Sequence, residues 1–139
     1  SGGQDVLYGS DGNDILYAKS ATATSNTASD DSLYGGAGND TFVIAATAAG
    51  SLGNAISTVA IVFSFEDGND KIHLTGFGFS GGLTPAFQTS TTLTGGVNSI
   101  VQKAGTNEVT VAINGGGTDY TVIRVTGVTT LDLNDFTFS

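Results

Sequence analysis

Two stretches of the sequence decide the fold: GSDGNDILY at residues 9–17 and GGAGNDTFV at residues 35–43. Both follow the nine-residue pattern G-G-x-G-x-D-x-U-x, in which U is a large apolar residue, and Ser10 takes the place of one glycine. Two partial copies, at residues 3–8 and 31–34, continue the pattern in phase. The aligned columns are Asp5, Asp14, Asp31 and Asp40, followed by Leu7, Leu16, Leu33 and Phe42. Four copies in phase predict one repeated structural unit.

Each copy has a turn half and a strand half. The glycines permit the positive φ angles that a Cβ opposes, so the first six residues favour a turn. The triplet x-U-x that follows is a very short strand with one large side chain facing inward. Asp-Gly, Gly-Asn and Asn-Asp pairs also form ordinary turns, and that explanation would suffice for a single copy. Four phased copies instead favour a shared role for the aligned aspartates.

The repeat resembles that of the RTX, or hemolysin-type calcium-binding, family. The resemblance implies an all-β fold, with a short parallel β-roll that binds Ca²⁺ in its stacked turns and continues into a β-sandwich-like C-terminal cap. A hard divalent cation takes six to eight oxygen ligands, which carboxylates and exposed carbonyls of such turns can provide. The candidate metal-binding residues are Gly9, Asp11, Gly12, Asp14, Gly35, Ala37, Gly38 and Asp40, with Asp5 and Asp31 as a second set. In the family, the position of Asp11 often carries a further acidic ligand.

Spacing distinguishes the two sides of the predicted roll. Successive nonapeptides alternate between the sides, so turns on one side recur about every 18 residues. The pairs Asp5–Asp31 and Asp14–Asp40 are both 26 residues apart, because the polar loop 18–30 lengthens both intervals. That loop belongs to the turn before Asp31, which is on the Asp5 side of the roll, and it carries no calcium pattern. We therefore expect one well-formed Ca²⁺ site at Asp14 and Asp40, a weaker one at Asp5 and Asp31, and two or three ions in all.

The nine-residue period ends after residue 43, and other strand signals follow. Candidate strands lie at residues 57–65, 71–74, 99–103, 108–113 and 120–125, with residues 114–117 as a hairpin turn. In the first of these, Ile61, Phe63 and Phe65 are expected to share the buried face. In the second, Ile72 and Leu74 should face inward. Phe77 and Phe79, among glycines, are expected to close an edge of the core.

Two later segments are also similar to RTX proteins secreted through type I exporters. FEDGNDKIHL, at residues 65–74, resembles the segment D-F-x-x-G-x-D-K-I-D-L, although Ala60, Ser64 and His73 stand where the family has acids. The last residues, 129–139, resemble the terminal pattern L-x-x-x-D-F-x-U of the secretion region. We therefore divide the chain into an RTX β-roll at residues 1–43, with the inserted loop 18–30, and a β-rich cap and secretion region at residues 44–139.

Composition argues against several classes of function. The chain has 13 acidic residues against 4 basic ones, a net charge of -9, which argues against nucleic acid as a partner. It has no cysteine, and therefore no disulfide, thiol nucleophile or thiolate metal site. No run of 18 apolar residues occurs, so no membrane span is expected. The first residues lack the basic and apolar regions of a cleavable secretory signal.

The sequence offers little for catalysis. His73 is the single histidine, and its place opposite Ile72 and Leu74 predicts a solvated position. The carboxylates of Asp67 and Asp70 are better explained as turn or calcium groups than as a glycosidase pair. We expect no enzyme activity within the chain.

The resemblance leaves three hypotheses of function. The first is the calcium-binding C-terminal module of a type I-secreted bacterial cell-surface protein, an S-layer protein or RTX adhesin, which folds on Ca²⁺ outside the cell. Its partners would be calcium, the exporter, and neighbouring copies or other cell-surface components, and 20 Thr, 13 Ser and 21 Gly with 3 Lys are typical of such proteins. The second is the same module on a secreted hydrolase, a serralysin-like protease or a lipase, which residues upstream of Ser1 would reveal. The third is a carbohydrate-binding repeat module, for which 4 basic residues make anionic glycans poor ligands.

Overall fold

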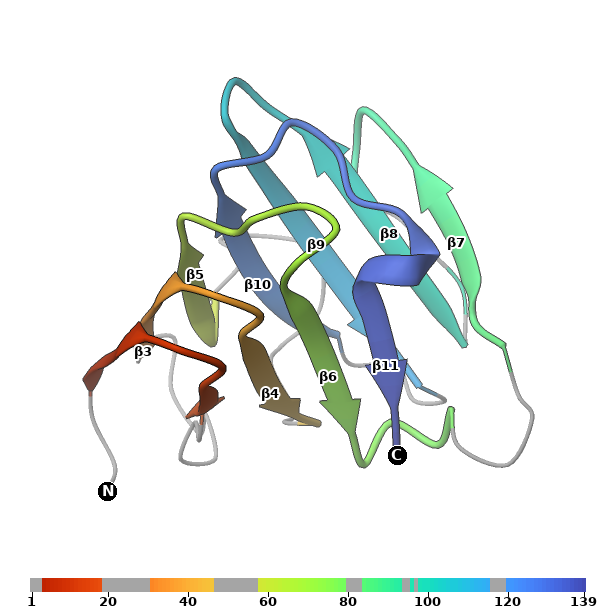
Figure 1. Cartoon of the computed structure of the whole chain (residues 1–139). Helices are drawn as coiled ribbons and strands as arrows, with labels where there is room; N and C mark the ends of the chain where they lie inside the picture. Colours follow the sequence, from red (N-terminus) through yellow and green to blue (C-terminus); the bar gives the residue numbers. More distant parts are fainter. Residues whose placement is uncertain are drawn as a thin grey trace.

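The computed structural model describes residues 4–18, 31–46, 58–79, 84–93, 96, 98–115 and 120–139. In these residues the strands form two sheets that face each other (Figure 1). The strands of the larger sheet, in spatial order, are β1 (Val6–Asp11), β3 (Asp31–Ala37), β5 (Ala60–Phe63), β10 (Thr121–Thr126), β9 (Glu108–Asn114), β8 (Ser99–Ala104) and β7 (Ala86–Thr89). Those of the smaller sheet are β11 (Phe136–Phe138), β6 (Lys71–Thr75), β4 (Thr41–Ala45) and β2 (Ile15–Ala18). The all-β class expected from the repeats is confirmed.

From β1 to β6, and again from β10 to β11, the chain passes alternately between the two sheets and so forms a coil. The strand pairs β1 and β2, β3 and β4, β5 and β6, and β10 and β11 form successive coils, and neighbouring coils pair in parallel. Leu7 pairs with Leu33 and Leu16 with Phe42, so the register between the first two coils is the 26 residues predicted from the repeats. The predicted β-roll is therefore present.

The large apolar residues of the repeats form columns between the sheets. In the larger sheet the strand register aligns Leu7, Leu33, Val62 and Val125, and in the smaller sheet Leu16, Phe42, Ile72 and Phe136. Leu33, Phe42, Val62 and Ile72 are fully buried and belong to one core. Each strand is too short to bury its apolar side alone, so the coils are stable only when stacked.

The larger sheet continues past the coils as an antiparallel extension. Strand β10 pairs with β9 and β9 with β8, both antiparallel, and β7 joins β8 in parallel. This confirms the predicted pairing of the strands at 108–113 and 120–125; residues 116 and 117 of the predicted hairpin turn lie outside the described residues. Residues before and after position 43 belong to the same two sheets and to the same hydrophobic core. The division of the chain at that residue stays a prediction from sequence pattern.

One prediction of which side chains face the core was wrong. In β5 the buried residues are Ala60 and Val62, whereas Ile61 and Phe63 lie on the outer face at intermediate exposure. Phe65 is buried nevertheless, because Ser64 has a φ of 57° and turns the chain between them. The strand ends before Ser64, so the alternation does not extend to Phe65.

The remaining inward and outward assignments are confirmed. Ile72 and Leu74 are buried, and Lys71 and His73 are on the outer side of β6. His73 contacts the hydroxyls of Thr137, at 2.8 Å from Nδ1, and Ser139, at 2.9 Å from Nε2. Phe77 and Phe79 are buried and stacked, with ring centroids 5.8 Å apart.

Candidate metal centre

Three aspartates stack at the turns that lead into the smaller sheet. The Oδ1 atom of Asp40 accepts a hydrogen bond from the backbone N–H of Asp14 at 3.0 Å, and the Oδ1 atom of Asp70 accepts one from the N–H of Asp40 at 3.0 Å. Asp40 and Asp70 are each 1% exposed. The carboxylates of Asp40 and Asp70 therefore each have one oxygen hydrogen-bonded to the preceding coil.

The second oxygens of two of these carboxylates are buried without a partner. The Oδ2 atoms of Asp14 and Asp40 are inaccessible to solvent and have no hydrogen-bond partner among the described residues. A buried carboxylate oxygen without a donor or a cation costs several kcal/mol, roughly, in lost hydration. Two such oxygens at matching positions of stacked turns indicate ligands for a positively charged group.

Glycine keeps the space around these oxygens open. A Cβ on Gly9 would lie 2.6 Å from the Oδ2 atom of Asp14 and 2.5 Å from the carbonyl oxygen of Gly35. A Cβ on Gly35 would in turn overlap the Oδ2 atom of Asp40. Any residue other than glycine at these two positions would therefore fill the space beside the carboxylates. Carboxylate and carbonyl oxygens converge there, which is the donor set that Ca²⁺ takes.

No three side chains of His, Cys, Asp or Glu come together as a metal-binding cluster in the described part of the chain. The turns explain this, because each of them contributes a single aspartate to the stacked column, and Asp11, the other carboxylate of the first turn, is exposed. A cation at these turns would have to complete its shell with backbone carbonyls, as hard cations commonly do. Counting acidic side chains alone therefore overlooks a site of this kind.

The column of aspartates ends at Asp70 in a different way. Its Oδ1 atom accepts from Asp40, and its Oδ2 atom accepts the backbone N–H of Glu66 at 2.9 Å. Both oxygens are satisfied by protein donors. Burial raises the pKa of Asp70 above its usual value, an effect that these two backbone hydrogen bonds partly offset. The Asp70 carboxylate thus supports the column and, unlike those of Asp14 and Asp40, has no buried oxygen without a partner.

Asp70 was not assigned to the repeat column from sequence, although a signal was present. Gly68-Asn69-Asp70 repeats the triplets Gly12-Asn13-Asp14 and Gly38-Asn39-Asp40, and Ile72 follows at the inward position. The interval from Asp40 is 30 residues rather than 26, so Asp70 does not lie in phase with the first two coils.

On the other side of the coil, Asp5 and Asp31 form a shorter column. The N–H of Asp5 donates to the Oδ1 atom of Asp31 at 3.1 Å, and Asp31 is 2% exposed. The next coil has Ala60 at the paired position, so no third carboxylate follows. The structure thus brings this pair together, and its metal binding stays a prediction.

The remaining predicted ligand positions lie in the same turns. Asp11 is exposed at the end of β1 and pairs in register with Ala37. Gly12 and Gly38 have φ angles of 122° and 135°, which other residues rarely adopt. The N–H of Gly12 donates to the carbonyl of Ala37 at 2.8 Å, which ties the first turn to the second.

Ser10 stands in the left-handed region, with a φ of 88°, where the aligned residue Gly36 has 107°. We expect Ser10→Gly to stabilise the folded chain by about 1 kcal/mol, because relief of backbone strain exceeds the added entropy of the unfolded chain. Urea unfolding at saturating Ca²⁺ measures this change. Ser32→Gly, in the regular strand β3, is the matched control and should destabilise by about 0.5–1 kcal/mol. Equal effects of the two substitutions would contradict the assignment of strain to Ser10.

The geometry defines a parallel β-roll with carboxylates stacked at its turns. A protein-family model, the RTX calcium-binding nonapeptide repeat, matches four copies over residues 1–20 and 27–43. The chain therefore carries RTX repeats, and these repeats bind Ca²⁺. A search of curated proteins found no match to the chain. No helix among the described residues is long and apolar enough to cross a membrane.

Proposed function

We propose that the chain is a calcium-dependent folding module, in which Ca²⁺ binds at the stacked turns Gly9–Asp14 and Gly35–Asp40, within a secreted cell-surface protein of structural or adhesive function. The observation that carries the proposal is the pair of buried, unpartnered Oδ2 atoms on Asp14 and Asp40. The absence of a Cβ at Gly9, Gly35 and Gly38 leaves room beside these carboxylates and the neighbouring backbone carbonyls, which could complete the ligand set.

The electrostatics of the turns link ion binding to folding. When bound, Ca²⁺ supplies the positive charge and the oxygen coordination that these buried carboxylates otherwise lack. Without it, stacking Asp14 on Asp40 brings two acidic groups together in a poorly hydrated place, which opposes the folded state. In the unfolded chain the carboxylates are hydrated and far apart, so neither effect opposes that state. Calcium binding and folding of the roll should therefore occur together.

The expected stabilisation is large enough to control folding. Binding to the folded form alone contributes RT ln(1 + [L]/Kd), which is about 1.4 kcal/mol per site when free Ca²⁺ is ten times Kd. Two such sites contribute about 3 kcal/mol, against a typical total of about 5–15 kcal/mol for a domain. The roll is built of very short strands, so this contribution should decide whether its first coils form.

Removal of calcium tests the proposal. We expect EDTA to reduce the β-type circular dichroism of the full chain and to broaden its NMR spectrum, and Ca²⁺ to restore both. Mg²⁺ at the same concentration is the control and should restore little, because it requires a tighter octahedral shell and gives up its waters reluctantly. A spectrum and thermal midpoint that stay unchanged in EDTA would contradict calcium-dependent folding.

The extracellular part of the proposal is supported by the RTX repeats and by the abundance of Thr, Ser and Gly. Low calcium in the cytosol would leave the chain open for export, and higher calcium outside would fold it. Attaching the chain to the C-terminus of a reporter in a bacterium with a type I exporter tests this directly. Export should require the exporter and residues 129–139. Equal amounts of exported reporter without that segment would count against the proposed secretion role.

A further inference from the structure

Two tyrosines of adjacent coils are in direct ring contact on the outer face of the larger sheet. Tyr8 on β1 pairs in register with Tyr34 on β3, and the two rings are stacked with their centroids 4.7 Å apart at 18°. Parallel strands in register project equivalent side chains in the same direction, so the two phenol ends point the same way. The ring carbons next to each hydroxyl therefore lie beside their counterparts on the other ring.

Phe63 on β5 covers the other face of Tyr34, with the ring centroids 4.5 Å apart at 3°. Phenylalanine has no hydroxyl, so the one phenol that stacks on Tyr34 across β1, β3 and β5 is that of Tyr8. Tyr34 is partly exposed although it lies between these two rings. The outer side of the row therefore reaches solvent across the face of the sheet, and this does not depend on the edge at β1.

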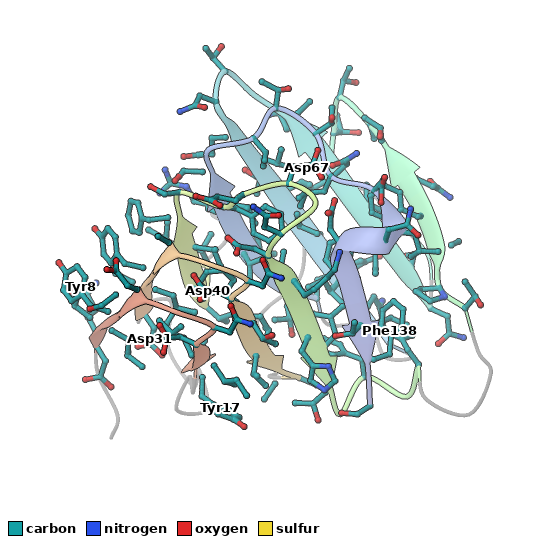
Figure 2. All side chains as sticks on the ribbon, viewed as in Figure 1. Tyr8, Tyr17, Asp31, Asp40, Asp67 and Phe138 are labelled. Atoms are coloured by element: carbon teal, nitrogen blue, oxygen red, sulfur yellow. The ribbon has the colours of Figure 1, made fainter. Side chains whose placement is uncertain are left out.

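The chain has four tyrosines, and the other two are placed differently. Tyr17 lies on β2 in the smaller sheet, where its partner in register is Val43. Figure 2 shows Tyr8 and Tyr17 at separate places on the first coil. Tyr120 is buried in a small cluster with Leu93. One pair of tyrosines is therefore arranged so that its two rings can react with each other.

We propose that Tyr8 and Tyr34 form a site of oxidative cross-linking, at which a one-electron oxidant, a haem peroxidase with hydrogen peroxide, couples the two rings to dityrosine. Each phenol loses one electron and its hydroxyl proton. The two phenoxyl radicals form one carbon–carbon bond between the ring carbons next to the oxygens, and the hydrogens on those carbons move to the oxygens. The two electrons and two protons released reduce one hydrogen peroxide to two waters.

The new bond would join the first coil to the second in a chain that has no cysteine for a disulfide. It closes the segment between Tyr8 and Tyr34, which contains the polar loop 18–30, and so restricts the unfolded chain as a disulfide does. Oxidising surroundings outside the cell favour covalent links of this kind.

The dependence of this site on calcium rests on the proposed function. The coils that carry Tyr8 and Tyr34 also carry the stacked turns of Asp14 and Asp40. If Ca²⁺ folds these coils, it also brings the two rings together. Cross-linking should therefore be more efficient in calcium, and the cross-linked chain should in turn fold at lower calcium.

Oxidation of the full chain by a haem peroxidase and hydrogen peroxide tests the inference. Trypsin cuts after Lys19, which places Tyr8 and Tyr34 on separate peptides, 1–19 and 20–71. Mass spectrometry should find these two peptides joined with the loss of two hydrogen atoms, together with dityrosine fluorescence. The yield in saturating Ca²⁺ should exceed that in EDTA at least about fivefold, because the folded roll holds the rings in contact.

Two variants identify the residues that react. Tyr8→Phe keeps the ring stack but removes one phenol, and it should abolish the joined peptides. Tyr17→Phe is the matched control, because it makes the same change on the same tryptic peptide and should leave the yield unchanged. In a calcium titration followed by circular dichroism, the cross-linked chain should fold at a midpoint at least about tenfold lower than the parent chain.

Circular dichroism of the same samples separates this inference from the proposed function. A chain that folds with Ca²⁺ but gives no joined peptides overturns the cross-linking site alone. Equal yields from Tyr8→Phe and Tyr17→Phe, coupling mainly between separate chains, or equal yields from chain that is unfolded in EDTA also overturn it. Equal yields from a chain that is folded both in Ca²⁺ and in EDTA support the site and contradict calcium-dependent folding instead.

Discussion

Asp40→Asn should abolish calcium-dependent folding of the roll. The substitution should lower the stability of the chain in Ca²⁺ but not in EDTA. The amide oxygen of Asn can still accept the N–H of Asp14, so the hydrogen bond of the column is retained. What is lost is the charged Oδ2 atom, which is buried and lacks a hydrogen-bond partner among the described residues. We expect calcium affinity to fall at least about tenfold, because ligand charge sets affinity at such sites.

The reversal follows from the cost of the buried charge. In EDTA the variant should be as stable as the parent chain or more stable, because a neutral amide replaces an uncompensated carboxylate. In saturating Ca²⁺ it should be less stable, because the ion no longer contributes its binding energy. Urea unfolding and calorimetric calcium titration measure the two effects separately.

Asp67→Asn is the matched control for this experiment. It makes the same chemical change at an exposed carboxylate in the turn before β6 (Figure 2). We expect its calcium affinity and its stability to remain near those of the parent chain. A loss of calcium binding in Asp67→Asn equal to that in Asp40→Asn would mean that overall acidity, rather than the stacked turns, binds the ion.

Gly38→Ala should strongly destabilise the roll. Its φ of 135° already disfavours any side chain, at a cost of about 1–3 kcal/mol. The added Cβ would also overlap the carbonyl oxygen of Gly12 and lie 2.7 Å from its carbonyl carbon. Because the first and second coils stack through this contact, we expect their separation and a loss of at least about 3 kcal/mol.

Gly12→Ala separates the two causes. Gly12 occupies the same position of the repeat with a φ of 122°, and a Cβ there meets nothing within 4 Å. It should therefore cost the backbone strain alone and remain folded in calcium. Thermal unfolding of both variants at one Ca²⁺ concentration provides the comparison. Equal destabilisation would show that the spacing between coils does not depend on glycine at position 38.

Much of the roll could be predicted because its repeats encode register as well as strands. The interval of 26 residues between Asp14 and Asp40 is also the offset between Leu16 and Phe42, and the strands pair with that offset. One large inward residue per triplet predicted the columns of the core. Local glycine-rich turns and short strands need no distant information, so a sequence pattern was sufficient.

The third coil was harder to predict because its repeat is incomplete and shifted. Its turn keeps Gly68, Asn69 and Asp70, but Glu66 supplies through its N–H the partner that the second oxygen of Asp70 needs. Almost any residue at position 66 would offer this backbone N–H, so the residue type there does not predict the hydrogen bond. The outward face of Phe63 was missed for a related reason, since its partner in the aromatic stack is Tyr34 from another coil.

The central claim is that Ca²⁺ binds the stacked turns through Asp14 and Asp40. Crystals of the chain grown in CaCl₂ and measured for the anomalous signal of calcium test it most directly. The claim predicts anomalous peaks about 2.3–2.6 Å from the Oδ2 atoms of these two aspartates, with backbone carbonyls of the glycine turns completing each shell. Peaks confined to other positions, or none at saturating calcium while the roll is folded, would contradict it.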